Sequence, residues 1–342
     1  MMKQITIAAL TGGRNVPSAR FRVRQYIDHL AGEGVEVTEF PAPWGMYPPF
    51  NVMARPAWCM ASLFARLPTV LQSYRYDLTL LQREMLSTFV TLEPFTKRPR
   101  ILDVDDAIWL HPRGQFAARL ASKCEGVLCG NAFLADYFRQ WNPNVTIIPT
   151  AVDTDRYIQG KSVDAPIIGW SGTSSGLKYV YEIEPALAAV LQKVPSAKLR
   201  IVCDAMPTFR TIPTSRAEFI RWSPANEVRA IQEMAVGIMP LDDSLWVRGK
   251  CSFKMLTYMA CGIPVVVSPV GMNAEILTHG RVGFGVSTLD EWVDSLLQLA
   301  GNIEQRVEMG KIGRQTVLDN YSVNVIAPRL AQALIRVANA NR

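Results

Sequence analysis

Three positively charged side chains stand close together in the second half of the chain. Arg248, Lys250 and Lys254 fall within the segment WVRGKCSFK. Cations grouped in this way stabilise the negative charge that develops on a departing phosphate. Gly271 comes later, just before a segment with a helical pattern, and N–H groups at a helix start carry partial positive charge. The stretch therefore predicts a place to hold phosphate oxygens.

The elements around these residues follow from apolar spacing and chain breakers. Ser252 is a residue type that caps helices, and apolar residues at helical spacing follow it. Gly262 and Pro264 end that helix, since glycine tolerates a left-handed cap and proline cannot continue a helix. Residues 265–267 (VVV) form a continuous apolar run, as a strand covered on both faces does. An αβα unit without any ligand has the same pattern, and this alternative stays open.

The segment FKMLTYMACGIPVVVSPVGMNAEI resembles the C-terminal signature of the retaining glycosyltransferases of family 4. The resemblance implies an α/β protein of the GT-B fold, with two Rossmann-like domains facing across a cleft and a C-terminal helix crossing back to the first domain. It also implies transfer of a sugar, with retention, from a nucleotide-diphosphate sugar to a glycan or polyprenyl-linked acceptor in surface polysaccharide biosynthesis. The matching residues are Met259, Ala260, Gly262, Pro264, Val265, Val266, Gly271 and Glu275.

Composition fits a soluble protein of two domains. The 342 residues are 49% hydrophobic and 19% charged, and no apolar run reaches the roughly 18 to 20 residues that span a bilayer. Six cysteines without a CxxC pair and only three histidines argue against a zinc site and for reduced thiols. Since no signal-peptide pattern opens the chain, we expect a cytoplasmic protein. The net charge of +6 favours anionic partners, and the resemblance points to a nucleotide sugar rather than nucleic acid.

A glycine turn after the first apolar strand opens a βαβ unit. Gly12 and Gly13 precede a helix predicted over Ser18–Ala31, and a second strand follows. The turn lacks the GxGxxG spacing that a dehydrogenase needs. Arg20, Arg22 and Arg24 alternate through the helix start, either as solvated charges or as a cationic rim. The resemblance places both glycines near the donor and puts Arg20 and Arg24 on the acceptor side.

A predicted strand over Arg100–Ile108 ends in three carboxylates. Asp103, Asp105 and Asp106 follow its apolar residues, and ligands of open α/β sheets bind beyond the carboxyl ends of strands. An Asp-x-Asp pair also suggests the metal-binding motif of the GT-A glycosyltransferases, which would leave the C-terminal signature unexplained. The resemblance implies instead that Asp105 lies where the family has a strand-end histidine and acts on the donor sugar, without a metal. His111 is its rival and is assigned to the acceptor side.

A helix predicted near residues 55–75 carries apolar residues and arginines. The stretch Trp58–Leu71 is rich in apolar side chains, and Arg55, Arg66 and Arg75 flank or interrupt it. This pattern fits a helix lying on a membrane surface, and it fits a helix packed on a sheet equally well. Peripheral attachment to an anionic inner membrane face is therefore one hypothesis for a lipid-linked acceptor.

The second half of the chain restarts as a βα repeat after a polar linker predicted at Gln159–Asp164. Residues 150–157 (TAVDTDRY) resemble the element that closes the N-terminal domain in family 4. We therefore expect an N-terminal acceptor domain at 1–160, a C-terminal nucleotide-sugar domain at 161–324, and a returning helix at 325–342. The small-residue loop SGTSSGLK lets backbone amides approach a diphosphate, with Gly172 inside the loop and Lys178 supplying a charge.

The chain departs from the family at the donor site. Family members usually carry two glutamates eight positions apart, and Gly249 and Thr257 occupy those positions here. Thr257 can offer the ribose one neutral hydrogen bond, while the cations near it take over the diphosphate. The alternatives are a degenerate, non-catalytic nucleotide-sugar-binding protein and a sugar-nucleotide epimerase. The expected catalytic residues are Asp105 and Lys254, and the expected donor-binding residues are Gly12, Gly13, Gly172, Lys178, Arg248, Lys250, Thr257, Gly271, Met272, Asn273 and Glu275.

Overall fold

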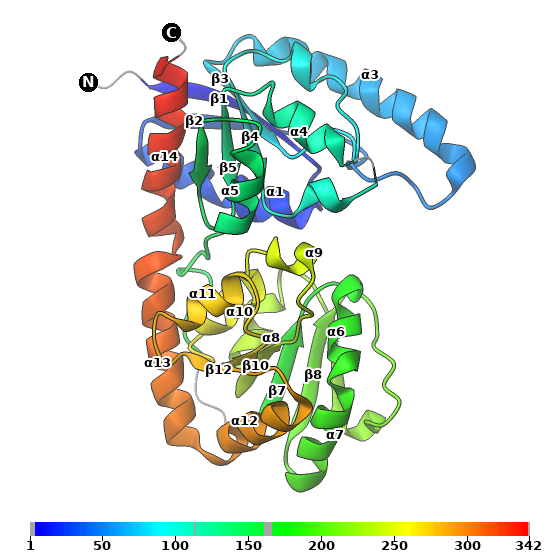
Figure 1. Ribbon diagram of the computed structural model, residues 1–342, viewed down its shortest axis with the longest axis vertical. Helices are drawn as coiled ribbons and strands as arrows, with labels where there is room; N and C mark the ends of the chain where they lie inside the picture. Colours follow the sequence, from blue (N-terminus) through cyan, green and yellow to red (C-terminus); the bar gives the residue numbers. More distant parts are fainter. Residues whose placement is uncertain (1–3, 113, 161–165, 341–342) are drawn as a thin grey trace. The chain divides into compact units, whose positions relative to one another are not determined.

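The computed structural model describes residues 4–112, 114–160 and 166–340, which divide into two compact units. The N-terminal unit comprises Met1–Ala151, Gly249–Cys251 and Val323–Arg342. The C-terminal unit comprises Val152–Arg248 and Ser252–Ser322. Each unit is built on one sheet of six parallel strands (Figure 1). The expectation of two Rossmann-like halves is therefore confirmed.

The N-terminal sheet has the strand order β2-β1-β3-β4-β5-β6, and every neighbouring pair is parallel. Most of its strands are continuous apolar runs, because helices and loops cover both faces of a parallel sheet. The carboxyl ends of all six strands therefore point to one edge. The strands are β1 (Ile5–Thr11), β2 (Val35–Pro41), β3 (Leu78–Gln82), β4 (Arg100–Val104), β5 (Gly126–Cys129) and β6 (Val145–Ile147).

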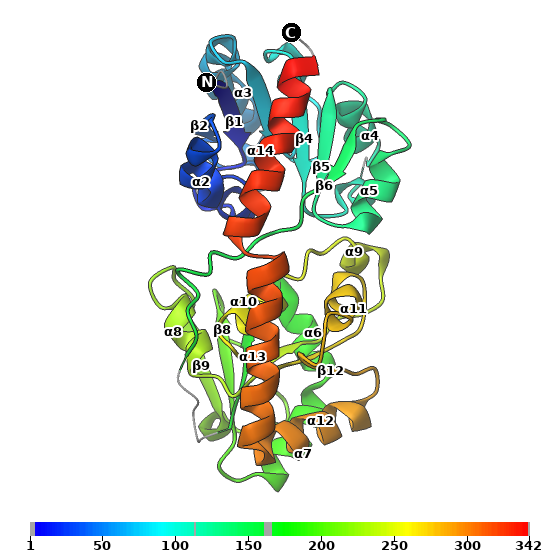
Figure 2. The ribbon, with the colours of Figure 1, turned by 90° about the vertical axis from the view of Figure 1, so that its left-hand side faces the viewer.

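Helices of the N-terminal unit include one from the far end of the chain. Figure 2 shows α14 lying across one face of the N-terminal sheet, and its apolar residues join the core formed by β1, β3 and β4. The helix expected over Ser18–Ala31 is interrupted, because Val23 leaves helical geometry and a 3-10 turn, Arg24–Tyr26, follows. The helices are α1 (Pro17–Arg22), α2 (Ile27–Gly32), α3 (Arg55–Ser73), α4 (Gln115–Ala121), α5 (Ala132–Phe138) and α14 (Val323–Ala340).

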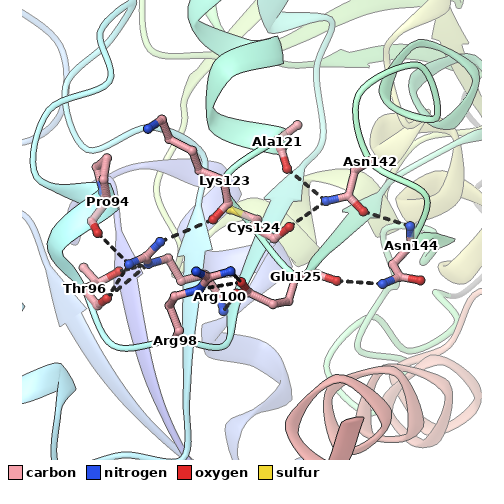
Figure 3. Close-up of polar contacts among 10 residues, drawn as sticks. All are labelled: Pro94, Thr96, Arg98, Arg100, Ala121, Lys123, Cys124, Glu125, Asn142 and Asn144. Carbon is pink, nitrogen blue, oxygen red and sulfur yellow. Dashed lines mark hydrogen bonds and ion pairs between the residues drawn. The ribbon is translucent and has the colours of Figure 1, made fainter. Parts of the chain in front are cut away.

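The amino edge of the N-terminal sheet is closed by hydrogen bonds (Figure 3). The guanidinium of Arg100 donates to the carbonyl oxygens of Thr96 and Lys123. The amide of Asn142 donates to the carbonyl oxygens of Ala121 and Cys124. These side chains satisfy main-chain groups that would otherwise be buried without partners.

The C-terminal sheet has the strand order β12-β11-β10-β7-β8-β9, again parallel throughout. The buried strand predicted at residues 265–267 is β11. Gly262 has a positive φ of 73°, as a left-handed helix stop requires. The strands are β7 (Ile167–Ser171), β8 (Lys198–Cys203), β9 (Ala217–Arg221), β10 (Val236–Met239), β11 (Val265–Val267) and β12 (Gly283–Gly285).

The helices of the C-terminal unit largely follow the predicted periodicity. Residues 177–193 form two helices, α6 and α7, because Pro185 stands in the first turn of α7 and cannot continue a preceding helix. The helices are α6 (Leu177–Glu182), α7 (Glu184–Lys193), α8 (Glu227–Gln232), α9 (Leu245–Arg248), α10 (Phe253–Ala260), α11 (Met272–Leu277), α12 (Leu289–Gly301) and α13 (Ile303–Asn320).

The N-terminal unit ends at Ala151, earlier than residue 160. The segment that follows is bound to α13, because the Val152 N–H donates to the Tyr321 carbonyl (2.8 Å) and Arg314 Nη1 donates to the Tyr157 carbonyl (2.9 Å). Of the linker predicted at Gln159–Asp164, residues 161–164 lie outside the described residues.

A buried ion pair joins α1 to β4. Arg22 Nε and Nη2 donate to the two carboxylate oxygens of Asp103 at 3.0 and 2.6 Å, and Nη1 donates to the Ile148 carbonyl at 2.6 Å. The side chains are 1% and 3% exposed. Burial alone would lower the pKa of Arg22, but the attraction and hydrogen bonds of Asp103 raise it above its ordinary value. Arg22 is therefore no part of a surface rim, and Asp103 is occupied by a guanidinium.

Replacing Asp103 by asparagine should destabilise the fold strongly. Asp103→Asn leaves the Arg22 guanidinium buried without its counter-charge, which costs about 3–5 kcal/mol. Urea unfolding followed by circular dichroism measures the change. The exposed carboxylate of Glu36 on β2 gives the matched control, because Glu36→Gln should change the free energy of unfolding by no more than about 0.5 kcal/mol. Equal stability of the two variants would contradict the role of the ion pair.

Candidate functional site

The loop after β7 brings Gly172 and Lys254 together. A Cβ on Gly172 would lie 2.6 Å from Cε of Lys254 and 2.7 Å from the ring of Trp170, so only glycine fits at this position. Lys254 Nζ lies 5.8 Å from the centre of the Trp170 ring, within the range of a cation–π contact. Lys254 thus approaches the small-residue loop at the carboxyl edge of the C-terminal sheet, where the sequence had pointed to Lys178.

Carboxylates already bind the other groups expected to hold phosphate in this loop. The Ser174 N–H donates to Asp204 at 2.6 Å, and its hydroxyl donates to the same carboxylate. Burial tends to raise the pKa of Asp204, but the Ser174 N–H and other hydrogen bonds lower it overall. Lys178 Nζ lies 4.0 Å from Asp242, and both side chains are exposed. A phosphate at this loop would have to compete with these two carboxylates.

In the glycine loop before α11, three of the backbone amides are already bonded within the turn. Gly271 has a φ of 54°, and a Cβ there would lie 3.1 Å from the Cα of Arg248. The N–H groups of residues 273–275 donate to the carbonyl oxygens of Val270 and Gly271 at 3.1 to 3.4 Å. These three amides therefore bond within the turn and do not face a ligand.

Ser252 does not cap α10 with its side chain, which corrects the sequence prediction. Its backbone is left-handed (φ 50°) and its hydroxyl donates to Asn273 Oδ1 at 2.7 Å. Asn273 is fully buried and donates in turn to the Ser268 carbonyl at 3.1 Å. Through these two hydrogen bonds, Asn273 links the loop before α10 to the turn that follows β11. Met272 beside it is also buried, whereas Glu275 is exposed.

Arg248, Lys250 and Thr257 were also expected to bind the donor, and each has different hydrogen-bond partners. Arg248 is bound by both oxygens of Asp243, at 2.7 and 2.9 Å. Lys250 belongs to the N-terminal unit, where its carbonyl accepts a hydrogen bond from Asn131 at 3.1 Å. Thr257 is 3% exposed and donates its hydroxyl to the Lys254 carbonyl at 2.8 Å. The predicted set therefore divides between the two units.

Gly12 and Gly13 allow close packing of the loop that follows β2. A Cβ on Gly12 would lie 2.7 Å from Sδ of Met46, and a Cβ on Gly13, whose φ is 138°, would lie 3.2 Å from the Cα of Gly45. The Gly12 N–H donates weakly to Gln82 Oε1 at 3.4 Å.

The expected cationic rim does not form as predicted. Arg24 pairs with both oxygens of Glu39 at 2.8 Å, and Arg22 is buried. The guanidinium of Arg20 lies 4.3 Å from the centre of the Phe21 ring.

A charged cluster that the sequence did not reveal lies at the carboxyl ends of β3 and β4. Arg83 and Glu84 directly follow β3 and are 4% and 1% exposed. Arg83 approaches Asp106 (3.5 Å), and it raises the electrostatic potential at Asp105 and His111. Burial first, and then Arg83, lowers the pKa of His111. The signal in the sequence is a pair of opposite charges, Arg83-Glu84, placed directly after an apolar strand.

Asp105, the expected catalytic residue, lies in this cluster. Its Oδ1 is buried and has no hydrogen-bond partner, while its carbonyl accepts a hydrogen bond from Cys251 Sγ at 3.3 Å. Within the part of the chain that the structure describes, no group of three or more His, Cys, Asp or Glu side chains is placed to hold a metal ion. Among the same residues, no helix is both long enough and apolar enough to cross a bilayer.

Comparison with known sequences identifies the C-terminal unit. Residues 165–302 match the family model described as "Glycosyl transferases group 1". A curated relative, the GDP-mannose-dependent alpha-(1-6)-phosphatidylinositol monomannoside mannosyltransferase of Mycolicibacterium smegmatis, is 28% identical over 214 residues. The match covers 55% of this chain and 55% of the relative, so the chain spans about half the length of the relative. The C-terminal unit is therefore similar to glycosyltransferases of group 1.

Solved structures share the fold along nearly the whole chain. Sucrose-phosphate synthase from Thermosynechococcus elongatus superposes with a TM-score of 0.73 at 15% identity, covering 98% of this chain and 100% of that one. HepE from Anabaena, in complex with UDP and glucose, gives a TM-score of 0.70 at 15% identity, covering 97% and 100%. The chain therefore has the two-domain α/β GT-B fold, as the resemblance implied.

The packing of Gly249, the position at which the resemblance implies a glutamate, yields a prediction. A Cβ on this buried glycine would lie 2.7 Å from the Cβ and 2.8 Å from the backbone nitrogen of Ala107. Gly249→Ala should therefore lower the free energy of unfolding by about 1–3 kcal/mol through overpacking. Gly249→Glu should lower it further, because it also buries a charge, instead of restoring a donor contact.

Thermal and urea unfolding test this prediction. Gly32→Ala, in the last turn of α2 where no neighbour lies within 4 Å of the added carbon, is the matched control and should be as stable as the wild type or slightly more so. A Gly249→Glu variant of unchanged stability would show that the loop has room for the glutamate.

Proposed function

We propose that this chain, with the GT-B fold and its group 1 segment at residues 165–302, is a retaining hexosyltransferase. It moves a sugar from a nucleotide-diphosphate sugar to a glycan or lipid-linked glycan, in surface polysaccharide biosynthesis. The observation that carries the proposal is Lys254, held against Gly172 and Trp170 at the carboxyl edge of the sheet within the matched segment. Ligands of open α/β sheets bind at this edge.

The relatives narrow the choice of donor. The mycobacterial relative is named for GDP-mannose, and HepE has been solved with UDP and with UDP-glucose. We therefore propose a hexose donor on UDP or GDP. The C-terminal unit would hold the donor and the N-terminal unit the acceptor, with the protein at the cytoplasmic face of the membrane.

The proposed chemistry breaks the bond between the anomeric carbon and the diphosphate oxygen. The ammonium group of Lys254 stabilises the negative charge that grows on the departing diphosphate, and Lys178 adds a second positive charge once the phosphate displaces Asp242. The acceptor hydroxyl bonds to the anomeric carbon on the face that the diphosphate leaves, and its proton departs with the leaving group. Asp105 acts beside the transferred sugar. These cations take the place of a metal ion.

A non-catalytic nucleotide-sugar-binding protein is the second candidate. It is favoured by Thr257, whose hydroxyl already bonds to the Lys254 carbonyl, and by Gly249, which has no room for a carboxylate. A third candidate, an epimerase, would isomerise the donor without any acceptor. Thermal shift with a panel of UDP-, GDP- and dTDP-sugars, followed by turnover with and without acceptor in EDTA, separates the three.

The acceptor proposal draws support from the orientation of α3. This helix runs along the outside of the N-terminal unit (Figure 1). Its buried face carries mostly polar residues, and its exposed face is apolar. Buried residues are Ser62, Arg66, Val70 and Ser73, and exposed ones are Met60 (54%), Phe64 (64%), Leu67 (41%) and Leu71 (71%).

A buried arginine fixes this orientation. Arg66 donates hydrogen bonds to the carbonyl oxygens of Phe40 and Thr11, and burial lowers its pKa to about 10. No aspartate or glutamate occurs between residues 40 and 76, while Arg55 and Arg75 are exposed. An exposed apolar helix face without acidic neighbours suits the surface of an anionic bilayer. We therefore propose that α3 docks on anionic lipid, where a lipid-linked acceptor is found.

Removing the ammonium group of Lys254 should lower turnover more than donor binding. An interaction that strengthens as the diphosphate leaves acts on the chemical step. Lys254→Ala should therefore reduce turnover at least tenfold, while the donor dissociation constant changes less. Lys193→Ala, at the exposed end of α7, is the control and should behave as wild type. Wild-type turnover of Lys254→Ala would transfer the role to Lys178.

Acidic residues on the exposed face of α3 should release the protein from membranes. Phe64→Asp with Leu71→Asp should abolish co-flotation with vesicles containing phosphatidylglycerol, and high salt should weaken binding of the wild type, because exposed charges are screened. Ile303→Asp, at an exposed apolar position of α13, is the control and should float as wild type does. Equal flotation of wild type with neutral and anionic vesicles would contradict the proposal.

A further inference from the structure

The cluster at the carboxyl ends of β3 and β4 holds polar atoms that the protein itself does not satisfy. Among the described residues, four buried atoms there have no hydrogen-bond partner: Gln82 Nε2, Arg83 Nε, Glu84 Oε2 and Asp105 Oδ1. The ion pair between Arg83 Nε and Glu84 Oε2 spans 3.8 Å, too long for a hydrogen bond. Unsatisfied groups gathered at one site call for a ligand, because buried polar atoms are otherwise paired.

The amino edge of the same sheet differs in how its polar side chains are satisfied. There the side chains drawn in Figure 3 bond to carbonyl oxygens and to one another, and none of their atoms is among the buried unpartnered ones. The unsatisfied atoms are thus concentrated at the edge where ligands of parallel sheets bind.

Hydrogen bonds within the protein fix the loop next to the cluster. Glu93, fully buried, accepts the N–H groups of Met85 and Thr91 and so fixes the loop that follows Arg83 and Glu84. Glu84 Oε1 accepts the Thr88 N–H at 3.4 Å, which leaves Oε2 for another donor.

The charge of the cluster restricts the chemistry of the ligand. Three carboxylates, those of Glu84, Asp105 and Asp106, surround the single guanidinium of Arg83. His111 adds little positive charge near pH 7, because its pKa is lowered. The cluster is therefore negative overall and repels phosphate and carboxylate groups. It presents strong acceptors and one strong donor, which match the hydroxyl groups of a sugar.

We propose that Glu84 and Asp105 accept hydrogen bonds from the hydroxyl groups of an uncharged sugar ring, to which Arg83 donates. The same carboxylates exclude a ring that carries a carboxylate or phosphate. The proposal rests on the proposed function only in taking this ring to be the acceptor sugar that receives the transferred one, which puts Asp105 beside both sugars; binding itself requires no donor.

The test measures binding of three methyl glycosides to the full chain by ligand-observed NMR, without donor. Methyl α-mannopyranoside is neutral, the methyl glycoside of glucuronic acid is anionic, and that of glucosamine is cationic. The wild type should bind the neutral ring at least tenfold more tightly than the anionic one. Glutamine has nearly the same shape as glutamate. Glu84→Gln should weaken binding of the neutral ring at least fivefold and reduce the discrimination against the anionic ring.

Controls separate a local effect from loss of the fold. Glu36→Gln, an exposed carboxylate of the same unit, should bind as wild type does. If Glu84→Gln melts at a lower temperature, Asp106→Asn, whose side chain is 28% exposed, tests the charge argument instead and should reduce the discrimination against the anionic ring. Equal binding of neutral and anionic rings, or unchanged discrimination between them in the variant that carries the test, would overturn the proposal. The cationic ring should bind no more weakly than the neutral one, because the cluster is negative overall, and its exclusion would also overturn the proposal. If the chain binds the neutral ring but has no transferase activity, the proposed function alone would be contradicted.

Discussion

The ion pair between Arg22 and Asp103 determines what the N-terminal unit presents at its carboxyl edge. A buried guanidinium and carboxylate lose their hydration, and this loss is offset only when geometry and further hydrogen bonds are good. Both oxygens of Asp103 are bound, and the remaining nitrogen reaches the Ile148 carbonyl beyond β6. The pair thereby ties α1, β4 and the end of β6 together. Because Asp103 is the penultimate residue of β4, it also sets where Asp105 must emerge.

The cations expected to hold phosphate in the C-terminal unit are not buried in an ion pair like that of Arg22 and Asp103. Arg248 and Lys178 each lie beside an aspartate in solvent, and exposed ion pairs contribute little to stability. A multiply charged diphosphate can therefore displace those aspartates at low cost. Lys254 lies instead over the Trp170 ring. Its position is set by packing against Gly172, so this cation is already in place when a phosphate arrives.

The sequence could predict those features that depend on neighbours along the chain. The apolar run of β11 and the left-handed stop at Gly262 were both predicted, since length and glycine conformation are local properties. The partners of Ser252 and Arg22 were not, because Asn273 and Asp103 come from distant segments. Ser252 has the residue type of a helix cap, and only the fold shows that its hydroxyl is used elsewhere.

The helix that forms α3 was predicted, but the sequence left its orientation open, and it did not reveal the cluster near Arg83, for a related reason. An amphipathic pattern shows that a helix has two faces, and it is normally assumed that the apolar one is buried. In α3 the hydrogen bonds of Arg66 to carbonyl oxygens at the ends of β1 and β2 hold the polar face inward. Polar anchoring thus leaves the apolar face free for another surface. Likewise, Arg83 and Glu84 look like surface charges in the sequence, but the strand before them carries both into the interior. In both places buried charged groups break the usual pattern of an apolar interior, and such departures are expected at functional sites, which is why the two proposals are placed there.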